Sequence, residues 1–130
     1  MQIKKIKIFD EKDLKELFSS VNWKSSKEPE RLVKAFKNSS HVISAWEKEK
    51  LIGIIRSMDD DCWSANIDCL LVHKDYQKKG LGIKLLLELE KDLKHIQYIN
   101  VCPDDKNMLE FYEKAGFRII EGMYLQKVNE

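Results

Sequence analysis

The sequence has few cysteines, no long apolar run and almost no net charge, and each shortage argues against a class of protein. Cys62, Cys69 and Cys102 are odd in number and lack the spacing of metal ligands, which suits buried thiols in a reducing compartment better than a disulfide framework. The sequence contains no run of 18 apolar residues, so no segment is expected to span a membrane. The lysines near the N-terminus precede no apolar core of signal-peptide length. We therefore expect a cytoplasmic protein with no membrane partner.

The charges of the chain are numerous but balanced. Lys and Arg number 23 and Asp and Glu number 22, which leaves a formal net charge of +1. Such a chain has no overall field to attract nucleic acid, so we expect no nucleic-acid partner, and any anion must bind at a local site. With 130 residues, 43% of them hydrophobic, the chain is expected to form one domain over residues 1–130.

Apolar residues recur with the periods of strands and helices, in the order β-α-α-β-β-β-α-β-α-β-β. This order predicts an α/β fold of the α+β type. Its central sheet is expected to be mixed and mainly antiparallel, with about six to seven strands and about four helices on both faces. The predicted strands are 2–9, 41–46, 51–58, 63–72, 96–102, 117–120 and 123–128; the predicted helices follow Asp10, span 29–37 and 81–93, and run from Asp104 to about 115.

The stretch Gln77-Lys78-Lys79-Gly80-Leu81-Gly82 lies between a predicted strand and a predicted helix. Backbone N–H groups and the positive end of a helix dipole point to the same place in such a connection, so it is suited to bind an anion. Glycines let the backbone approach a phosphate closely, and the lysines add positive charge. The alternative is a connection whose glycines only form a tight turn, because short glycine motifs often match by chance.

A second motif, Asn107-Met108-Leu109-Glu110-Phe111-Tyr112-Glu113-Lys114-Ala115-Gly116-Phe117, favours the anion site over the turn. Together the two motifs and the element order resemble the GNAT superfamily of acyl-CoA-dependent N-acetyltransferases over essentially the whole chain. The loop fits the family's Arg/Gln-x-x-Gly-x-Gly/Ala pattern. The second motif resembles the family's Asn-x-x-Ala-x-x-Phe-Tyr-x-x-x-Gly-Phe signature and departs from it around Glu110, where small residues are common.

The resemblance implies that acetyl-CoA is the acyl donor. In the family, loop amides hold its diphosphate, and the strand before the loop pairs with the pantetheine arm through its backbone. Asn107 matches a residue that reaches the pantetheine or diphosphate, although capping of the last helix explains it equally well. The implied donor-binding residues are Leu70, Leu71, Val72, Gln77, Lys78, Lys79, Gly80, Leu81, Gly82, Ile83 and Asn107.

Tyr112 matches a family tyrosine near the thioester sulfur, where a phenol can protonate the departing thiolate. Aromatic packing against the sheet is its alternative role. Asp68 is the candidate base, because a carboxylate in an apolar central strand is costly unless it is paired or used. An equally good explanation is a buried pairing with Arg56 or with a backbone amide. His73 is less suited to be the base, and a covalent route through Cys69 or Cys102 is disfavoured.

The acceptor is implied to be a primary amine, which the family commonly binds near the loop between the first two helices. Trp23 and Arg56 are the candidate substrate-binding residues. The chain has no insertion that would clamp a protein, which favours a small molecule over a protein amine. A catalytically silent acyl-CoA-binding module and an unrelated nucleotide-binding protein are the alternatives. A homodimer is compatible with the family. No metal is expected, because residues 59–61 are more typical of a turn.

Overall fold

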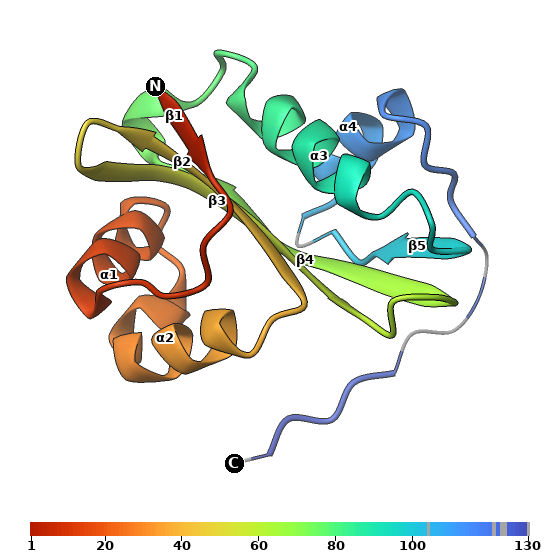
Figure 1. Cartoon of the computed structure of the whole chain (residues 1–130), viewed down its shortest axis with the longest axis horizontal. Helices are drawn as coiled ribbons and strands as arrows, with labels where there is room; N and C mark the ends of the chain where they lie inside the picture. The colour runs from red at the N-terminus through yellow and green to blue at the C-terminus, as the bar shows by residue number, and fades with distance from the viewer. Residues whose placement is uncertain (104, 121, 123–124, 130) are drawn as a thin grey trace.

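The computed structural model describes residues 1–103, 105–120, 122 and 125–129, and shows a central sheet with helices on both faces (Figure 1). The strands are β1 (Gln2–Lys4), β2 (His41–Glu47), β3 (Lys50–Asp59), β4 (Ser64–Val72) and β5 (Tyr98–Val101). The helices are α1 (Glu11–Ser20), α2 (Pro29–Lys37), α3 (Leu81–Asp92) and α4 (Met108–Lys114), with short 3₁₀ turns η1 (Lys24–Lys27) and η2 (Lys74–Tyr76).

The sheet follows the chain order β1-β2-β3-β4-β5. The first three pairings are antiparallel, and β4 pairs with β5 in parallel. Because parallel neighbours need a crossover, the chain passes through α3 between them. The predicted mixed, mainly antiparallel sheet is therefore confirmed, although it has five strands in the described residues instead of about six to seven. The predicted helix 29–37 is confirmed as well.

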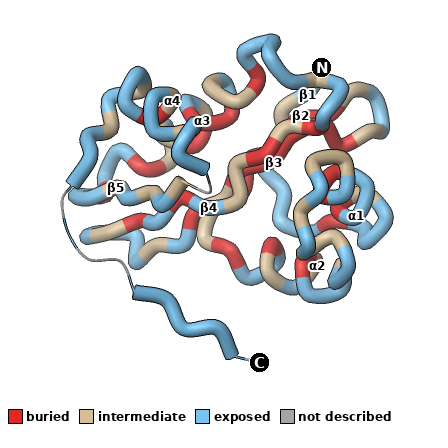
Figure 2. The backbone as a smooth tube through the Cα atoms, turned by 180° about the vertical axis from the view of Figure 1, so that it is seen from behind, coloured by how far each residue is buried: buried red, intermediate tan, exposed pale blue. Residues whose placement is uncertain are grey.

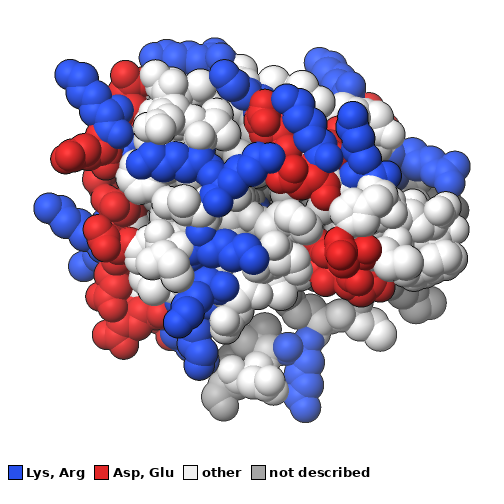
Figure 3. Space-filling model, viewed as in Figure 1, with Lys and Arg blue, Asp and Glu red and all other residues white. Residues whose placement is uncertain are grey.

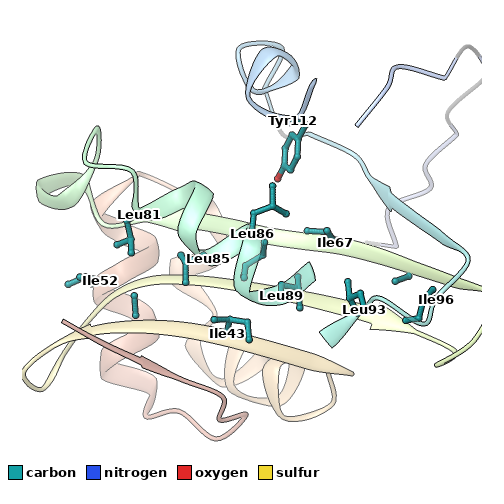
Figure 4. Packing of buried hydrophobic residues seen from close by; sticks show 13 residues of the cluster. Ile43, Ile52, Ile67, Leu81, Leu85, Leu86, Leu89, Leu93, Ile96 and Tyr112 are labelled. Atoms are coloured by element: carbon teal, nitrogen blue, oxygen red, sulfur yellow. The ribbon is translucent and has the colours of Figure 1, made fainter. Parts of the chain in front are cut away.

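Two hydrophobic clusters lie on the two faces of the sheet. Alternate residues of β2 and β3 point to opposite faces, so that Val42 and Ile54 pack with α1 and α2, whereas Ile43 and Ile55 pack with α3. The predicted inward face of the third helix is confirmed: the leucines at 81, 85, 86 and 89, and Leu93 just after the end of α3, are buried (Figure 4). Along α3, buried stretches alternate with exposed ones (Figure 2). Burying each leucine contributes about 1.5–3 kcal/mol, which holds α3 firmly on the sheet.

Several predicted boundaries differ from the structure, most of them by one or two residues, and the predicted C-terminal strands are absent from the described residues. The first strand ends at Lys4 instead of residue 9. The last helix starts at Met108. Asp104, the predicted cap of this helix, lies outside the described residues. The side chain of Asp105 accepts the Asn107 N–H just before the helix. Residues 117–120 are not a strand, and neither are the described residues 125–128 of the second predicted C-terminal strand. Ile119, Ile120, Leu125 and Val128 are exposed, whereas Phe117 packs partly against the core, and a strand pattern without a hydrogen-bonded neighbour is marginal in water.

Across the described ranges, the structure shows no helix that is both long enough and apolar enough to cross a membrane.

Candidate active site

Strands β4 and β5 are paired along only part of their length. The pairing runs from Ser64 opposite Tyr98 to Ile67 opposite Val101, where β5 ends. The pairing of β4 with β3 continues to Gly53 opposite Val72. Residues 68–72 of β4 therefore have a paired strand on one side only, within the part of the chain that the structure describes. Their outer backbone edge is available to an extended ligand.

A β-bulge in β4 begins where the two strands part. Between the pairs Arg56–Asp68 and Ile54–Leu71, one residue of β3 opposes two residues of β4. Cys69 has a φ of +56° in this bulge, a conformation that costs a residue with a side chain about 1–2 kcal/mol. Ile67 packs on the α3 side and Leu71 on the α1–α2 side, although residues four apart in a regular strand share a face. The bulge thus reverses which side chains at the end of β4 point to each face of the sheet.

A cavity of about 800 Å³ lies beside this open edge. It brings together most of the predicted site residues: Trp23, Leu70, Leu71, Val72, Gln77, Lys78, Gly80, Leu81, Gly82, Ile83 and Tyr112. The lining does not include Asp68, Arg56, Lys79 or Asn107. It also contains residues that the sequence analysis did not select, namely Val21, Tyr76, Asp105, Met108, Phe111 and Lys114. Helical spacing could have identified Met108 and Phe111, because they share a face with Tyr112.

The loop before α3 has the geometry of an anion site. Gly80, at the N-cap position of α3, has a φ of +80°, and Lys78 also has a positive φ, of +63°. The first helical N–H groups of α3 precede any acceptor within the helix and lie at its positive end. The side chain of Gln77 donates to the Val72 carbonyl at 3.0 Å. This bond ties the loop to the end of β4, so the open edge and the helix N-terminus are held together.

Tyr112 both packs in the core and lines the cavity. Its ring is 5% exposed and makes edge contacts with Phe111 and Phe117, at centroid distances of 5.1 and 5.6 Å. The ring extends from α4 with its hydroxyl end toward Leu86 of α3 (Figure 4). Packing and a role in proton transfer are therefore compatible for this side chain.

Asp68 is not buried, although its place in an apolar central strand predicted that it would be. Its side chain is 51% exposed, because β4 has no paired neighbour beside it on the β5 side within the described chain. Arg56 Nη2 lies 2.9 Å from Asp68 Oδ2, and the Cys69 N–H donates to Asp68 Oδ1 at 2.8 Å. Both of the structural pairings that the sequence left open are therefore present.

Arg56 is oriented toward α2. Its Nη1 atom donates to the Ala35 carbonyl and to Ser39 Oγ, each at 3.3 Å, and its guanidinium lies over the ring of Phe36. These contacts tie β3 to the end of α2. Trp23, the other predicted acceptor residue, does line the cavity, and its ring packs edge-on against Phe18 at 5.6 Å.

Asn107 occupies the N-cap position of α4 but has a helical backbone conformation, with φ −64° and ψ −19°. The described residues show no capping hydrogen bond from its side chain. The N–H of Asn107 instead donates to the carboxylate of Asp105 at 2.9 Å. The capping explanation for this asparagine is therefore not supported.

The thiols are less buried than the sequence predicted. Cys62 and Cys102 are exposed, and Cys69 is half-buried in the β4 bulge. The prediction of buried thiols is therefore wrong for the first two.

The aspartates at 59–61 form a turn. Asp60 Oδ1 accepts the N–H groups of Cys62, Trp63 and Ser64 at 2.7–3.1 Å. These backbone hydrogen bonds, with the one from Ser64 the largest cause, hold the pKa of Asp60 below its ordinary value. Among the residues that the structure describes, no group of three or more His, Cys, Asp or Glu side chains could hold a metal ion.

His41, Ser57 and Asp59 lie together at the opposite end of β3 but do not form a nucleophilic triad. Asp59 Oδ2 and Ser57 Oγ both contact the same ring nitrogen, Nδ1 of His41, at 2.8 and 3.3 Å. In a catalytic triad the histidine accepts the serine proton at one ring nitrogen and donates a hydrogen bond to the aspartate from the other, so the two partners must contact different nitrogens. The cluster therefore connects the ends of two strands and provides no second catalytic centre.

The near-zero net charge conceals a separation of charge on the surface. Acidic side chains gather along the edge formed by α1 and the β2–β3 turn (Figure 3). Burial raises the pKa of Asp13 there, and the neighbouring carboxylates of Asp10, Glu16 and Glu49 raise it further. The cavity loop, by contrast, contains two lysines, and no acidic residue occurs in the first turn of α3. An anionic ligand therefore meets a positive local field at the loop.

A family model described as an acetyltransferase (GNAT) domain matches residues 9–127. The chain belongs to this family, and the resemblance inferred from the two motifs is confirmed. A relative from Pyropia yezoensis, an uncharacterised N-acetyltransferase named ycf52, is 33% identical over 111 residues. The match covers 81% of this chain and 63% of that protein, so the chain spans less than two thirds of its relative.

Solved structures show the same fold. A GNAT family acetyltransferase from Streptococcus pneumoniae TIGR4 superposes with a TM-score of 0.82 at 25% identity, covering 98% of both chains. An aminoglycoside 6'-N-acetyltransferase in complex with coenzyme A superposes with a TM-score of 0.78 at 18% identity, over 93% of this chain and 87% of that one.

Proposed function

We propose that this protein transfers the acetyl group of acetyl-CoA to a primary amine of a small-molecule acceptor, by direct attack in a ternary complex. One observation carries the proposal: a single cavity is lined by the N-terminus of α3, by Leu70, Leu71 and Val72 at the end of β4, and by Tyr112. Family membership and the coenzyme A complex of a protein with the same fold support the choice of donor.

The residues present fit an acyl-CoA. The N–H groups of residues 78–83 are suited to the diphosphate, because they combine donors of the first helical turn, which have no acceptor within the helix, with a helix N-terminus and flanking lysines. The free edge of Leu70, Leu71 and Val72 offers backbone groups to the amides of the pantetheine arm, as an added strand would. In this proposal Lys79 contributes charge from outside the cavity lining, and Asn107 binds the donor from the start of α4.

Tyr112 acts as the general acid. The amine nitrogen forms a bond to the acetyl carbon, the bond from that carbon to sulfur breaks, and the tyrosine hydroxyl gives its proton to the departing thiolate. The proton that the nitrogen loses as the amide forms returns to the phenolate and restores the tyrosine. The acceptor must arrive as a free amine, so its ammonium proton has to be removed first. We assign that step to Asp68, whose half-exposed carboxylate follows Ile67, the last residue of β4 paired with β5.

Trp23 forms the acceptor side of the cavity. Its ring is braced by Phe18, which gives a fixed apolar surface suited to the hydrocarbon part of a small amine. Arg56 is held by Asp68 and α2, so in this proposal it acts on the acceptor side by fixing Asp68.

The test combines binding and turnover. Acetyl-CoA is expected to raise the melting temperature, and release of free CoA thiol is then measured with a panel of small amines and with peptide amines. Tyr112→Phe is expected to lower kcat about 100-fold or more while the melting temperature stays close to that of the wild type. Tyr98→Phe is the matched control, because Tyr98 is an exposed tyrosine at the start of β5.

The possible outcomes separate the alternatives. Stabilisation by acetyl-CoA without turnover of any amine would identify a silent acyl-CoA-binding module. Turnover of peptide amines alone would contradict the small-molecule acceptor. Stabilisation by a nucleotide but not by acetyl-CoA would exclude the proposed donor.

A further inference from the structure

A short connection from His73 to Tyr76 joins the open end of β4 to the anion-binding loop. The His73 N–H donates to the Ile52 carbonyl of β3 at 2.8 Å, and the Lys74 N–H donates to Ser20 Oγ of α1 at 3.2 Å. The connection is therefore anchored both to the sheet and to the helix that precedes Trp23. The mechanism proposed above gives no role to its buried histidine, which is 6% exposed.

The hydrogen bonds of the His73 ring define its tautomer. Nδ1 accepts the Asp75 N–H at 3.2 Å and so caps the η2 turn, which requires an unprotonated Nδ1 and places the proton on Nε2. Nε2 faces Glu16 Oε1 of α1 at 3.7 Å, and Lys50 Nζ of β3 approaches the same oxygen at 3.5 Å. The Asp75 carboxylate lies at 4.0 Å from Nδ1. The imidazole thus connects the turn to α1.

The same ring holds Tyr76, which lines the cavity. The His73 and Tyr76 rings meet edge to face at a centroid distance of 5.8 Å. Lys50 and Lys79 lie 5.6 and 5.7 Å from the centre of the Tyr76 ring, within the range of a cation–π interaction. Tyr76 is therefore positioned by groups from β3, from its own turn and from the loop. Lys79, which lies outside the cavity lining, reaches the donor site through this tyrosine.

We infer that His73 is a positioning residue for acyl-CoA: it caps the η2 turn and fixes Tyr76, and thereby presets the backbone of residues 77–80 for the donor. The inference rests on the proposed function. An ordered loop loses less conformational entropy when it binds, so loss of the cap weakens donor affinity and leaves the chemical step intact. The contacts through Glu16 and Ser20 also link the donor loop to α1, whose C-terminal connection carries Trp23.

Two substitutions of His73 separate positioning from packing. His73→Leu fills similar space but accepts no hydrogen bond, whereas His73→Asn provides a side-chain oxygen that can accept the Asp75 N–H. His73→Leu is expected to raise the Kd of acetyl-CoA about tenfold, measured by titration calorimetry, and to leave kcat within about twofold. His73→Asn is expected to restore most of the affinity. His41→Leu, at the opposite end of the sheet, is the matched control: it loses the contact with Asp59 and should keep the wild-type Kd.

The results distinguish a failure of the proposed function from a failure of the role of His73. If the wild type fails to bind acetyl-CoA, the proposed function fails and this inference fails with it. If the wild type binds and His73→Leu binds equally well, only the role of His73 is overturned. Equal weakening in the Leu and Asn variants, in step with a lower melting temperature, would show a packing role and would also overturn the inference.

Discussion

Arg56 and Asp68 face each other directly across β3 and β4, and Nη2 of the arginine lies 2.9 Å from Oδ2 of the aspartate. This is the last regular pair before the β4 bulge. The arginine side chain is 17% exposed and the aspartate side chain is 51% exposed. The buried Arg56 Nε has no hydrogen-bond partner among the described residues, so the guanidinium depends on its remaining contacts. The ion pair therefore braces the point at which β4 leaves β5.

Replacement of either partner tests whether Asp68 is also a base. Arg56→Gln and Asp68→Asn should each lower the free energy of unfolding, the arginine variant by about 1–3 kcal/mol and the aspartate variant by about 1 kcal/mol because its side chain is half-exposed. If Asp68 removes the proton from the amine, Asp68→Asn should lower kcat about 100-fold, whereas Arg56→Gln keeps the carboxylate, loses only the group that fixes it and should lower kcat less. Urea unfolding and thiol-release kinetics measure the two effects. A wild-type kcat in Asp68→Asn would assign Asp68 to the structural pair alone.

The two glycines of the loop are expected to respond differently to alanine. Gly80 has a φ of +80°, where a Cβ costs about 1–2 kcal/mol, so Gly80→Ala should destabilise the fold and weaken acetyl-CoA binding. Gly82 lies inside α3, and a Cβ there would meet only Phe111 carbons at 3.7 Å among the described residues. Gly82→Ala should therefore gain up to about 1 kcal/mol of stability.

Thermal unfolding and calorimetric binding of acetyl-CoA distinguish these effects. A Gly82→Ala variant that is more stable yet binds acetyl-CoA poorly would show that the donor, and not the fold, requires glycine at this position. Unchanged affinity would show that only Gly80 is needed for the loop.

Much of the fold follows from periodicity. Pro29 at a first helical position and the four buried leucines of α3 predicted the correct helices, because a helix that covers a sheet repeats its apolar residues at i, i+3 and i+4. The C-terminal strands were wrong for the described residues, because alternation at Ile119 and Leu125 indicates an extended chain without indicating a neighbour for it.

The geometry of the candidate active site was harder to predict from the sequence than the residues that line it. Local motifs pointed to Gly80 and Tyr112, and both residues line the cavity. The bulge depends on a positive φ at Cys69, a residue type that gives no signal for that conformation. Asp68 was expected to be buried because its strand is apolar, but burial depends on where β5 ends, and Val101 is about 30 residues further along the chain.

Gly53 sets the distance between α3 and the sheet. A Cβ at this position of β3 would lie 2.9 Å from Leu85 Cδ1 and 3.3 Å from Leu81 Cδ2. Gly53→Ala therefore requires these leucine ends, or the first turns of α3 that carry them, to shift, and we expect a loss of about 1–3 kcal/mol in the free energy of unfolding from overpacking. Acetyl-CoA affinity should fall as well, because these turns carry the anion-binding N–H groups. Urea unfolding and calorimetry measure both effects, with Gly122→Ala as an exposed control. Wild-type stability in Gly53→Ala would show that the leucines move aside freely.

The turn at Asp60 should make stability depend on pH in a defined direction. Its carboxylate accepts hydrogen bonds from three backbone N–H groups. These bonds lower the pKa of the Asp60 carboxyl group in the folded protein below the ordinary aspartate value of about 3.9. A carboxyl group with a lowered pKa stabilises the fold above its unfolded pKa and loses that contribution as pH falls through the folded pKa. Asp60→Ala should therefore lower the melting temperature at pH 7, and the difference from the wild type should narrow as pH falls below about 3.9. Asp10→Ala, which removes another exposed aspartate, is the control in the same thermal scans. A difference between wild type and Asp60→Ala that stays constant from pH 7 to pH 3 would show that the turn does not depend on the charge of Asp60.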